Sequence, residues 1–223
     1  MMAACCSVSE MSGVTQKQYA WPEGLKLQRW IERSVSVVTF PDIDDFHPQL
    51  IDAVMAREDD RTFAKSYPGH IGSSKIFHLD RWGDAAASLI DARARGLFCR
   101  ATGSEEAVVD LSWASVYRRG DYSLPHSHVR AAASVVYFLD SGVGDDGEDP
   151  GGRFSFADPR MEVCCRQQAH CMTTPCGPLA EAGTMIVFPG QLVHFVDLYR
   201  GSRPRITLSW NVNRRALPGE PPY

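Results

Sequence analysis

The stretch DYSLPHSHVRAAASVVYFLD, residues 121–140, joins a pair of histidines to a run of small, β-branched and aromatic residues. Such a run is typical of a buried strand, and His126 and His128 stand one residue apart where it begins. Side chains two residues apart in a strand point to the same face, so we expect both imidazoles to point the same way. Burying two imidazoles without partners is unfavourable, and a shared metal ion would satisfy both.

Similar segments follow one another through the second half of the chain. Turns rich in glycine and proline separate them, and no helical pattern lies between them. Strands in direct succession favour an antiparallel sandwich or barrel. We expect strands within residues 107–123, 129–141, 152–160, 183–199 and 203–215.

The first half of the chain has a different character. Its valine-rich segment is typical of a strand, and two later segments carry apolar residues at helical spacing. Turn residues dominate the segment between the two predicted helices. We expect a strand at 34–43, helices at 44–59 and 80–102, and loop structure at 60–80.

The predicted fold class is α+β, mainly β, in a single domain over residues 1–223. Residues 1–30 are interpreted as a loose polar leader. The strand and helices of residues 34–102 are expected to pack against a β core at 107–215. Two other segments are expected to be surface loops: the acidic, glycine-rich residues 142–152, and the cysteine-rich residues 164–176, which we interpret as a lid with reduced thiols.

Composition and charge narrow the class of protein. The chain has 223 residues, of which 44% are hydrophobic and 22% charged, as in soluble globular domains. A net charge of −4 argues against a nucleic-acid partner. No apolar run is long enough to span a membrane, so we expect no membrane partner. The N-terminus lacks an export signal, so we expect a cytoplasmic protein whose seven cysteines are reduced.

A third histidine and an arginine complete the pattern. His194 follows a Phe-Pro-Gly turn, and Arg205 opens the last predicted strand eleven residues later. Two neighbouring ligands and one distant histidine are typical of a facial triad, which leaves positions open on a metal ion. An arginine close by can hold a carboxylate through two parallel hydrogen bonds.

At these residues the chain resembles the Fe(II)- and 2-oxoglutarate-dependent oxygenases, in particular a small bacterial branch with a double-stranded β-helix, or jelly roll. The resemblance covers about residues 80–213. It depends on the order of several segments, which are Trp113, RRGDYSLPHSH, SVVYFL, GGRFSFADPR, GTMIVFPGQLVH and RPRITLSWNVN. It implies an enzyme that uses Fe(II), 2-oxoglutarate and O2 to oxidise, usually to hydroxylate, its substrate, with release of succinate and CO2.

The resemblance also implies roles for individual residues. His126 and His194 would bind iron, and Arg205 would anchor the carboxylate of 2-oxoglutarate. Further contacts to the cosubstrate are expected from Tyr117, Tyr137 and Thr207.

The chain departs from the family pattern at one position. The family usually has Asp or Glu where this sequence has His128. His128 can itself be a ligand, which gives an all-histidine triad. It can instead turn away and leave the position to water or a halide, or a nearby acid such as Asp121 or Asp197 can replace it. We favour the first interpretation, because histidine is a good ligand for iron.

The substrate is expected to be a small molecule or amino-acid-like, with Arg118, Arg130 and Trp113 as substrate-binding candidates. The sequence leaves a homodimer open. Two alternatives also remain: a three-histidine cupin-type dioxygenase that does not use 2-oxoglutarate, and a metal-binding jelly roll without catalysis.

Overall fold

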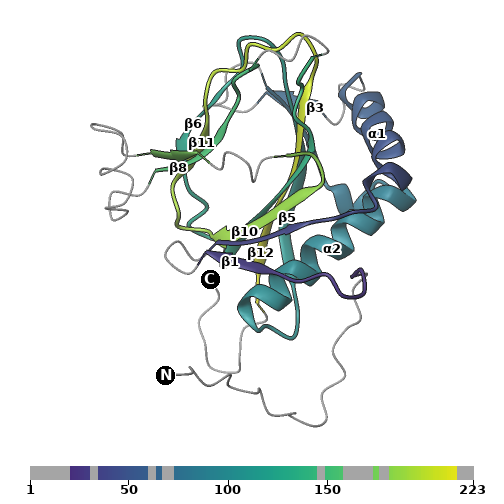
Figure 1. The fold of residues 1–223 in the computed structure, drawn as a ribbon, viewed down its shortest axis with the longest axis vertical. Helices are drawn as coiled ribbons and strands as arrows, with labels where there is room; N and C mark the ends of the chain where they lie inside the picture. Colours follow the sequence, from purple (N-terminus) through teal and green to yellow (C-terminus); the bar gives the residue numbers. More distant parts are fainter. Residues whose placement is uncertain are drawn as a thin grey trace, which may run out of the picture.

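The computed structural model describes residues 21–30, 35–59, 64–66, 73–144, 149–157, 173–175 and 181–214. Two antiparallel sheets face each other, and two helices cover the outer side of the larger sheet (Figure 1). The prediction of a mainly-β jelly roll with helices packed against it is confirmed. Among the described residues, no helix combines the length and the apolar character that a membrane span requires.

The larger sheet has eight strands in the order β1-β2-β10-β7-β12-β5-β4-β3. Its strands are β1 (Gln28–Trp30), β2 (Val35–Thr39), β3 (Ala64–Ser66), β4 (Ser74–Phe77), β5 (Val108–Tyr117), β7 (Ala133–Asp140), β10 (Thr184–Pro189) and β12 (Arg205–Asn213). The smaller sheet has the order β6-β11-β8-β9. Its strands are β6 (Ser123–His126), β8 (Phe154–Ala157), β9 (Thr173–Pro175) and β11 (His194–Val196).

The helices are α1 (His47–Asp59) and α2 (Ala85–Thr102), and short 3-10 turns lie at η2 (Ile43–Asp45) and η3 (Leu79–Arg81). They bury the apolar face of the larger sheet. On β12, Leu208 and Trp210 face the helices, whereas Thr207 and Ser209 face the space between the sheets. The Trp210 Nε1–H donates to Asp91 on α2 at 2.8 Å, which satisfies the indole inside this core. The alternation along β12 therefore separates a helix-packed core from a polar interior.

The same alternation decides the position of Tyr137. Its neighbour Val136 faces the interior, while Tyr137 packs beneath the helices with Phe46 and shares a 2.5 Å hydrogen bond with His47 Nε2. Tyr137 therefore lies on the helix side of the sheet and not in the pocket, so the structure does not support the prediction that it contacts the cosubstrate. All of β7 except its last residue is buried, so its sequence carries no polar alternation that distinguishes one face from the other.

We expect Tyr137→Phe to lower the free energy of unfolding by about 1–3 kcal/mol, because it leaves the buried His47 imidazole without its partner. The affinity for 2-oxoglutarate should not change. Chemical denaturation of the apoprotein and calorimetric titration measure the two effects. Tyr122→Phe, at a half-buried position, is the control. A loss of 2-oxoglutarate affinity in Tyr137→Phe would return this residue to the ligand site.

Several local predictions are corrected. Residues 60–80, predicted as loop, contain β3 and β4, which extend the larger sheet beyond β5. The leader does not run to residue 30, since Trp21 packs edge-on against Phe40 and β1 pairs with β2. The predicted segment 183–199 forms two strands in different sheets, β10 and β11.

The strand predicted to begin with the histidine pair begins later. His126 ends β6, His128 lies in the following turn, and β7 starts only at Ala133. Most of the cysteine-rich segment falls outside the described residues, so its prediction as a lid stays a prediction.

Candidate active site

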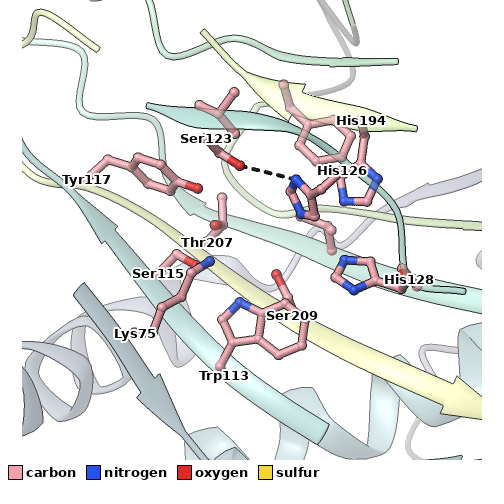
Figure 2. A pocket seen from close by; sticks show the side chains of 14 residues that line it. Lys75, Trp113, Ser115, Tyr117, Ser123, His126, His128, His194, Thr207 and Ser209 are labelled. Atoms are coloured by element: carbon pink, nitrogen blue, oxygen red, sulfur yellow. Dashed lines mark hydrogen bonds between the residues drawn. The ribbon is translucent and has the colours of Figure 1, made fainter. Parts of the chain in front are cut away.

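Three histidines converge between the two sheets (Figure 2). His194 opens β11 and pairs in register with His126 at the end of β6, while His128 reaches the same point from the next turn. One ring nitrogen from each histidine can be chosen so that all three lie within 4.8 Å of one another. The cluster can therefore surround one metal ion with three imidazole ligands.

Backbone carbonyl groups orient two of the three rings. The Nδ1 atom of His126 lies 2.7 Å from the carbonyl oxygen of Leu124, and that of His194 lies 2.9 Å from the carbonyl oxygen of Leu192. A carbonyl can only accept, so Nδ1 carries the proton and donates, and Nε2 presents its lone pair. A metal-ligating histidine characteristically uses its second nitrogen in this way, so these residues fit a metal ion.

The third ring is held by its turn. The His128 backbone N–H donates to the carbonyl of Gly190 at 2.7 Å, and His128 Nδ1 lies 3.4 Å from the Asn211 side-chain nitrogen. Gly190 belongs to the Phe-Pro-Gly turn, and a Cβ atom there would lie 2.2 Å from the carbonyl oxygen of Ala131. Only glycine permits this close approach, so the turn before His194 also supports His128.

Burial lowers the pKa of all three imidazoles. The pKa of His128 falls to about 4, through burial first and then through the charges of His126 and Lys75. His194 is the most deeply buried of the three, with 4% of its surface exposed. The rings are therefore neutral near pH 7, which is the form that binds a metal ion.

A pocket adjoins the histidines. Figure 2 shows the three imidazoles on one side and a group of polar side chains facing them. Apolar side chains of Val136, Phe154 and Val196 complete the lining. The polar lining residues other than the histidines are Lys75, Ser115, Tyr117, Ser123, Ser134, Thr207 and Ser209.

Two buried donors near this pocket have no hydrogen-bond partner within the described part of the chain. They are Trp113 Nε1, on a pocket-lining residue, and Arg205 Nη1. The Arg205 guanidinium lies 5.0 Å from the centre of the Tyr117 ring, and Arg205 itself is not among the lining residues. Unpaired buried donors indicate a missing acceptor, so these residues fit an anionic ligand such as 2-oxoglutarate.

The structure brings together most of the residues predicted for the site. His126, His128, His194, Trp113, Tyr117 and Thr207 line one pocket. Arg118 and Arg130 are exposed and lie outside the pocket lining, and Arg118 pairs with Glu58 at 2.6 Å. Their prediction as substrate contacts gains no support from this geometry.

The acids proposed as substitutes for His128 have other partners. Asp121 accepts a hydrogen bond from the Arg118 backbone at 2.7 Å, and Asp197 accepts one from the Arg153 backbone at 2.6 Å. Neither lines the pocket. The geometry therefore favours His128 as the third member of the cluster.

Five polar lining residues were not predicted from the sequence: Lys75, Ser115, Ser123, Ser134 and Ser209. Ser115 shares a strand face with Trp113 and Tyr117, so the alternation in β5 contained the signal. Lys75 had no signal, because its strand was not predicted.

Solved structures with this fold include several oxygenases. A prolyl-4-hydroxylase from Pseudomonas putida is 21% identical, with a TM-score of 0.52, and the match covers 82% of this chain and 94% of that one. A viral collagen prolyl hydroxylase from Paramecium bursaria Chlorella virus-1, in complex with 2-oxoglutarate, is 13% identical, with coverage of 80% and 95% and a TM-score of 0.52. EctD from S. alaskensis in its apo form is 17% identical, with coverage of 80% and 72% and a TM-score of 0.58.

No curated protein matches the sequence of this chain. Residues 111–211 match the family model described as "Putative 2OG-Fe(II) oxygenase", and this range contains all three histidines and Arg205. Over its jelly-roll core the chain therefore matches the 2-oxoglutarate- and Fe(II)-dependent oxygenases, a family of oxidoreductases that use Fe(II), 2-oxoglutarate and O2.

Proposed function

We propose that this oxygenase hydroxylates a small-molecule or amino-acid-like substrate, with iron held by His126, His128 and His194. The convergence of three neutral imidazoles near two buried donors that have no partner among the described residues, Trp113 Nε1 and Arg205 Nη1, carries the proposal. When bound, iron would supply the oxidation of a substrate C–H bond by O2, coupled to the conversion of 2-oxoglutarate to succinate and CO2.

The residues of the protein are proposed to bind and orient the metal ion and the cosubstrate. Leu124 and Leu192 carbonyls hold the His126 and His194 rings, so that Nε2 of each points to the centre of the cluster. Arg205, with Tyr117 and Thr207 on the same face of the sheet, is proposed to bind the cosubstrate carboxylate. Apolar residues around the histidines limit the access of water.

The substrate class is supported by the lining of the pocket and by the neighbours. The polar side chains of the lining could bind the polar groups of a small or amino-acid-like ligand. Two of the structural neighbours are named as prolyl hydroxylases, which modify an amino-acid side chain. Of the two alternatives raised by the sequence, a cupin-type dioxygenase without 2-oxoglutarate disagrees with the family. A jelly roll without catalysis predicts metal binding but no succinate.

The test is an anaerobic titration of the Fe(II)-loaded protein with 2-oxoglutarate, followed by addition of O2. We expect a visible metal-to-ligand absorption band on titration, and succinate after O2 is added. If neither appears, the proposed function fails. Candidate small carboxylic and amino acids can then be screened for stimulation of succinate release and for a mass increase of one oxygen atom.

We expect Arg205→Met to weaken 2-oxoglutarate binding by about 10- to 100-fold, because a buried charge-assisted hydrogen bond contributes about 1.5–3 kcal/mol. Calorimetric titration measures the change. Arg203→Met is the matched control, since Arg203 is more than half exposed and pairs with Asp140 at 3.2 Å. Equal affinities in both variants would rule out Arg205 as an anchor.

A further inference from the structure

The pocket contains a lysine to which the family match gives no role. Lys75 lies on β4, is 7% exposed, and donates from Nζ to Ser115 Oγ at 2.7 Å. Its Nζ also lies 5.4 Å from the centre of the Trp113 ring. No carboxylate within the described ranges forms an ion pair with it.

Burying the ammonium group of Lys75 lowers the stability of the fold. Burial, with a contribution from the charge of Arg205, lowers the pKa of Lys75 to about 7. An ammonium group has three protons to donate, and Ser115 accepts one of them. Lys75 lines the pocket and buries a cation that has only a serine hydroxyl as its hydrogen-bond partner in the part of the chain that the structure describes, so packing does not explain a cation there.

The register of the strands places Lys75 in a polar row. Lys75 pairs with Ser115 across β4 and β5, and Ser115 pairs with Thr207 across β5 and β12. The neighbouring row toward the histidines contains Trp113, whose ring lies 5.8 Å from that of His128. The two rows are about 6.6 Å apart, the repeat of two residues along a strand, which is close to the length of a five-carbon dicarboxylate.

The row on the other side contains Tyr117 and Arg205, which pair across β5 and β12. The Arg205 guanidinium lies 5.0 Å from the centre of the Tyr117 ring and does not line the pocket, whereas Lys75 does. A ligand with one end at the histidines would therefore reach the Lys75 row with its other end, and Arg205 would approach from beyond it.

We propose that Lys75 is a second cationic contact for the distal carboxylate of 2-oxoglutarate, supported by the hydroxyl groups of Ser115 and Thr207. The inference rests on the proposed function, since it assumes that the cosubstrate binds between the histidines and this row. Charge favours a dianionic ligand, because three neutral histidines supply no negative charge to offset a divalent metal ion, and its distal carboxylate would give Lys75 an anionic partner.

The test compares two ligands on the Fe(II) protein without oxygen, measured by calorimetry. 2-Oxovalerate has the chain length and keto-acid end of 2-oxoglutarate, with a methyl group in place of the distal carboxylate. Lys75→Met is expected to weaken 2-oxoglutarate binding by about tenfold or more, and 2-oxovalerate binding by less than about threefold. Lys26→Met, at an exposed position, is the matched control and should change neither.

A purely structural role for Lys75 predicts that Lys75→Met lowers the melting temperature of the apoprotein. Under the proposed ligand-binding role, Lys75→Met removes a buried cation, so the melting temperature should stay unchanged or rise while the affinity for 2-oxoglutarate falls. Lys75→Gln, which keeps a polar side chain of similar length, serves as the second variant and should show the same selectivity between the ligands. In the double variant with Arg205→Met, the two losses should be non-additive, because both side chains meet one carboxylate.

Two outcomes would overturn the inference while the proposed function stands: unchanged 2-oxoglutarate affinity in both Lys75 variants, or equal losses for the two ligands. The first result would assign Lys75 to the substrate instead. A wild-type protein that binds no 2-oxoglutarate overturns the proposed function itself, and with it the role of Lys75.

Discussion

Replacing His194 with alanine is expected to abolish iron binding and succinate formation. His194 is buried, and its ring is stacked on Phe154 and packed edge-on against Phe188. No other described side chain on β11 can take its place, since the next pocket-lining residue of that strand is Val196. Loss of an outer-shell partner alone lowers metal affinity 10- to 100-fold, so we expect loss of the ligand itself to exceed about 100-fold.

The measurement is the iron content after gel filtration, together with succinate release under saturating 2-oxoglutarate. His78→Asn is the control, because His78 lies outside the pocket lining and asparagine tolerates its positive φ of 63°. Full iron occupancy in His194→Ala, with the control intact, would rule out the three-histidine site.

The variants His128→Ala and His128→Asp are expected to differ clearly in their affinity for iron. If His128 is the third ligand, alanine leaves the metal with two protein ligands, and iron affinity should fall by more than about 100-fold. Aspartate supplies the carboxylate that the family usually has at this position, so it should retain more iron than alanine does. The geometry that carries this expectation is the convergence of His128 with its two neighbours, with ring centroids 5.2 and 5.1 Å from those of His126 and His194.

Iron affinity and succinate formation of both variants should be measured with and without added chloride. Unchanged iron binding and turnover in His128→Ala would refute ligation by His128. Dependence of turnover on chloride in that variant would favour a site in which a halide takes the open position.

The fold could be predicted where the two faces of an element differ chemically. On β12, apolar residues alternate with Arg205, Thr207 and Ser209, so the sequence distinguishes the core face from the interior. β7 is apolar on both faces, so its sequence could not indicate that Tyr137 faces the helices. In such a strand, the layers that cover the two faces of the sheet decide which side chains point to the helices and which to the interior.

Short strands escaped prediction for a related reason. β4 has four residues, and only two of them are fully buried. Its structure comes from pairing with β5, a long-range contact that local propensity does not encode. Lys75 was missed as a consequence, because a lysine in a predicted loop is expected to be solvated.

The sequence by itself determined the mainly-β class, the histidines with Arg205, and the resemblance to the oxygenases, because hydrophobic periodicity and the order of motifs are local properties of a chain. Only the tertiary structure decided that the three rings meet. His126 and His194 become neighbours through the pairing of β6 with β11, and His128 joins them through a turn that Gly190 holds. Tertiary structure likewise decided which cations face the pocket, since strand pairing sets the side to which each buried side chain points.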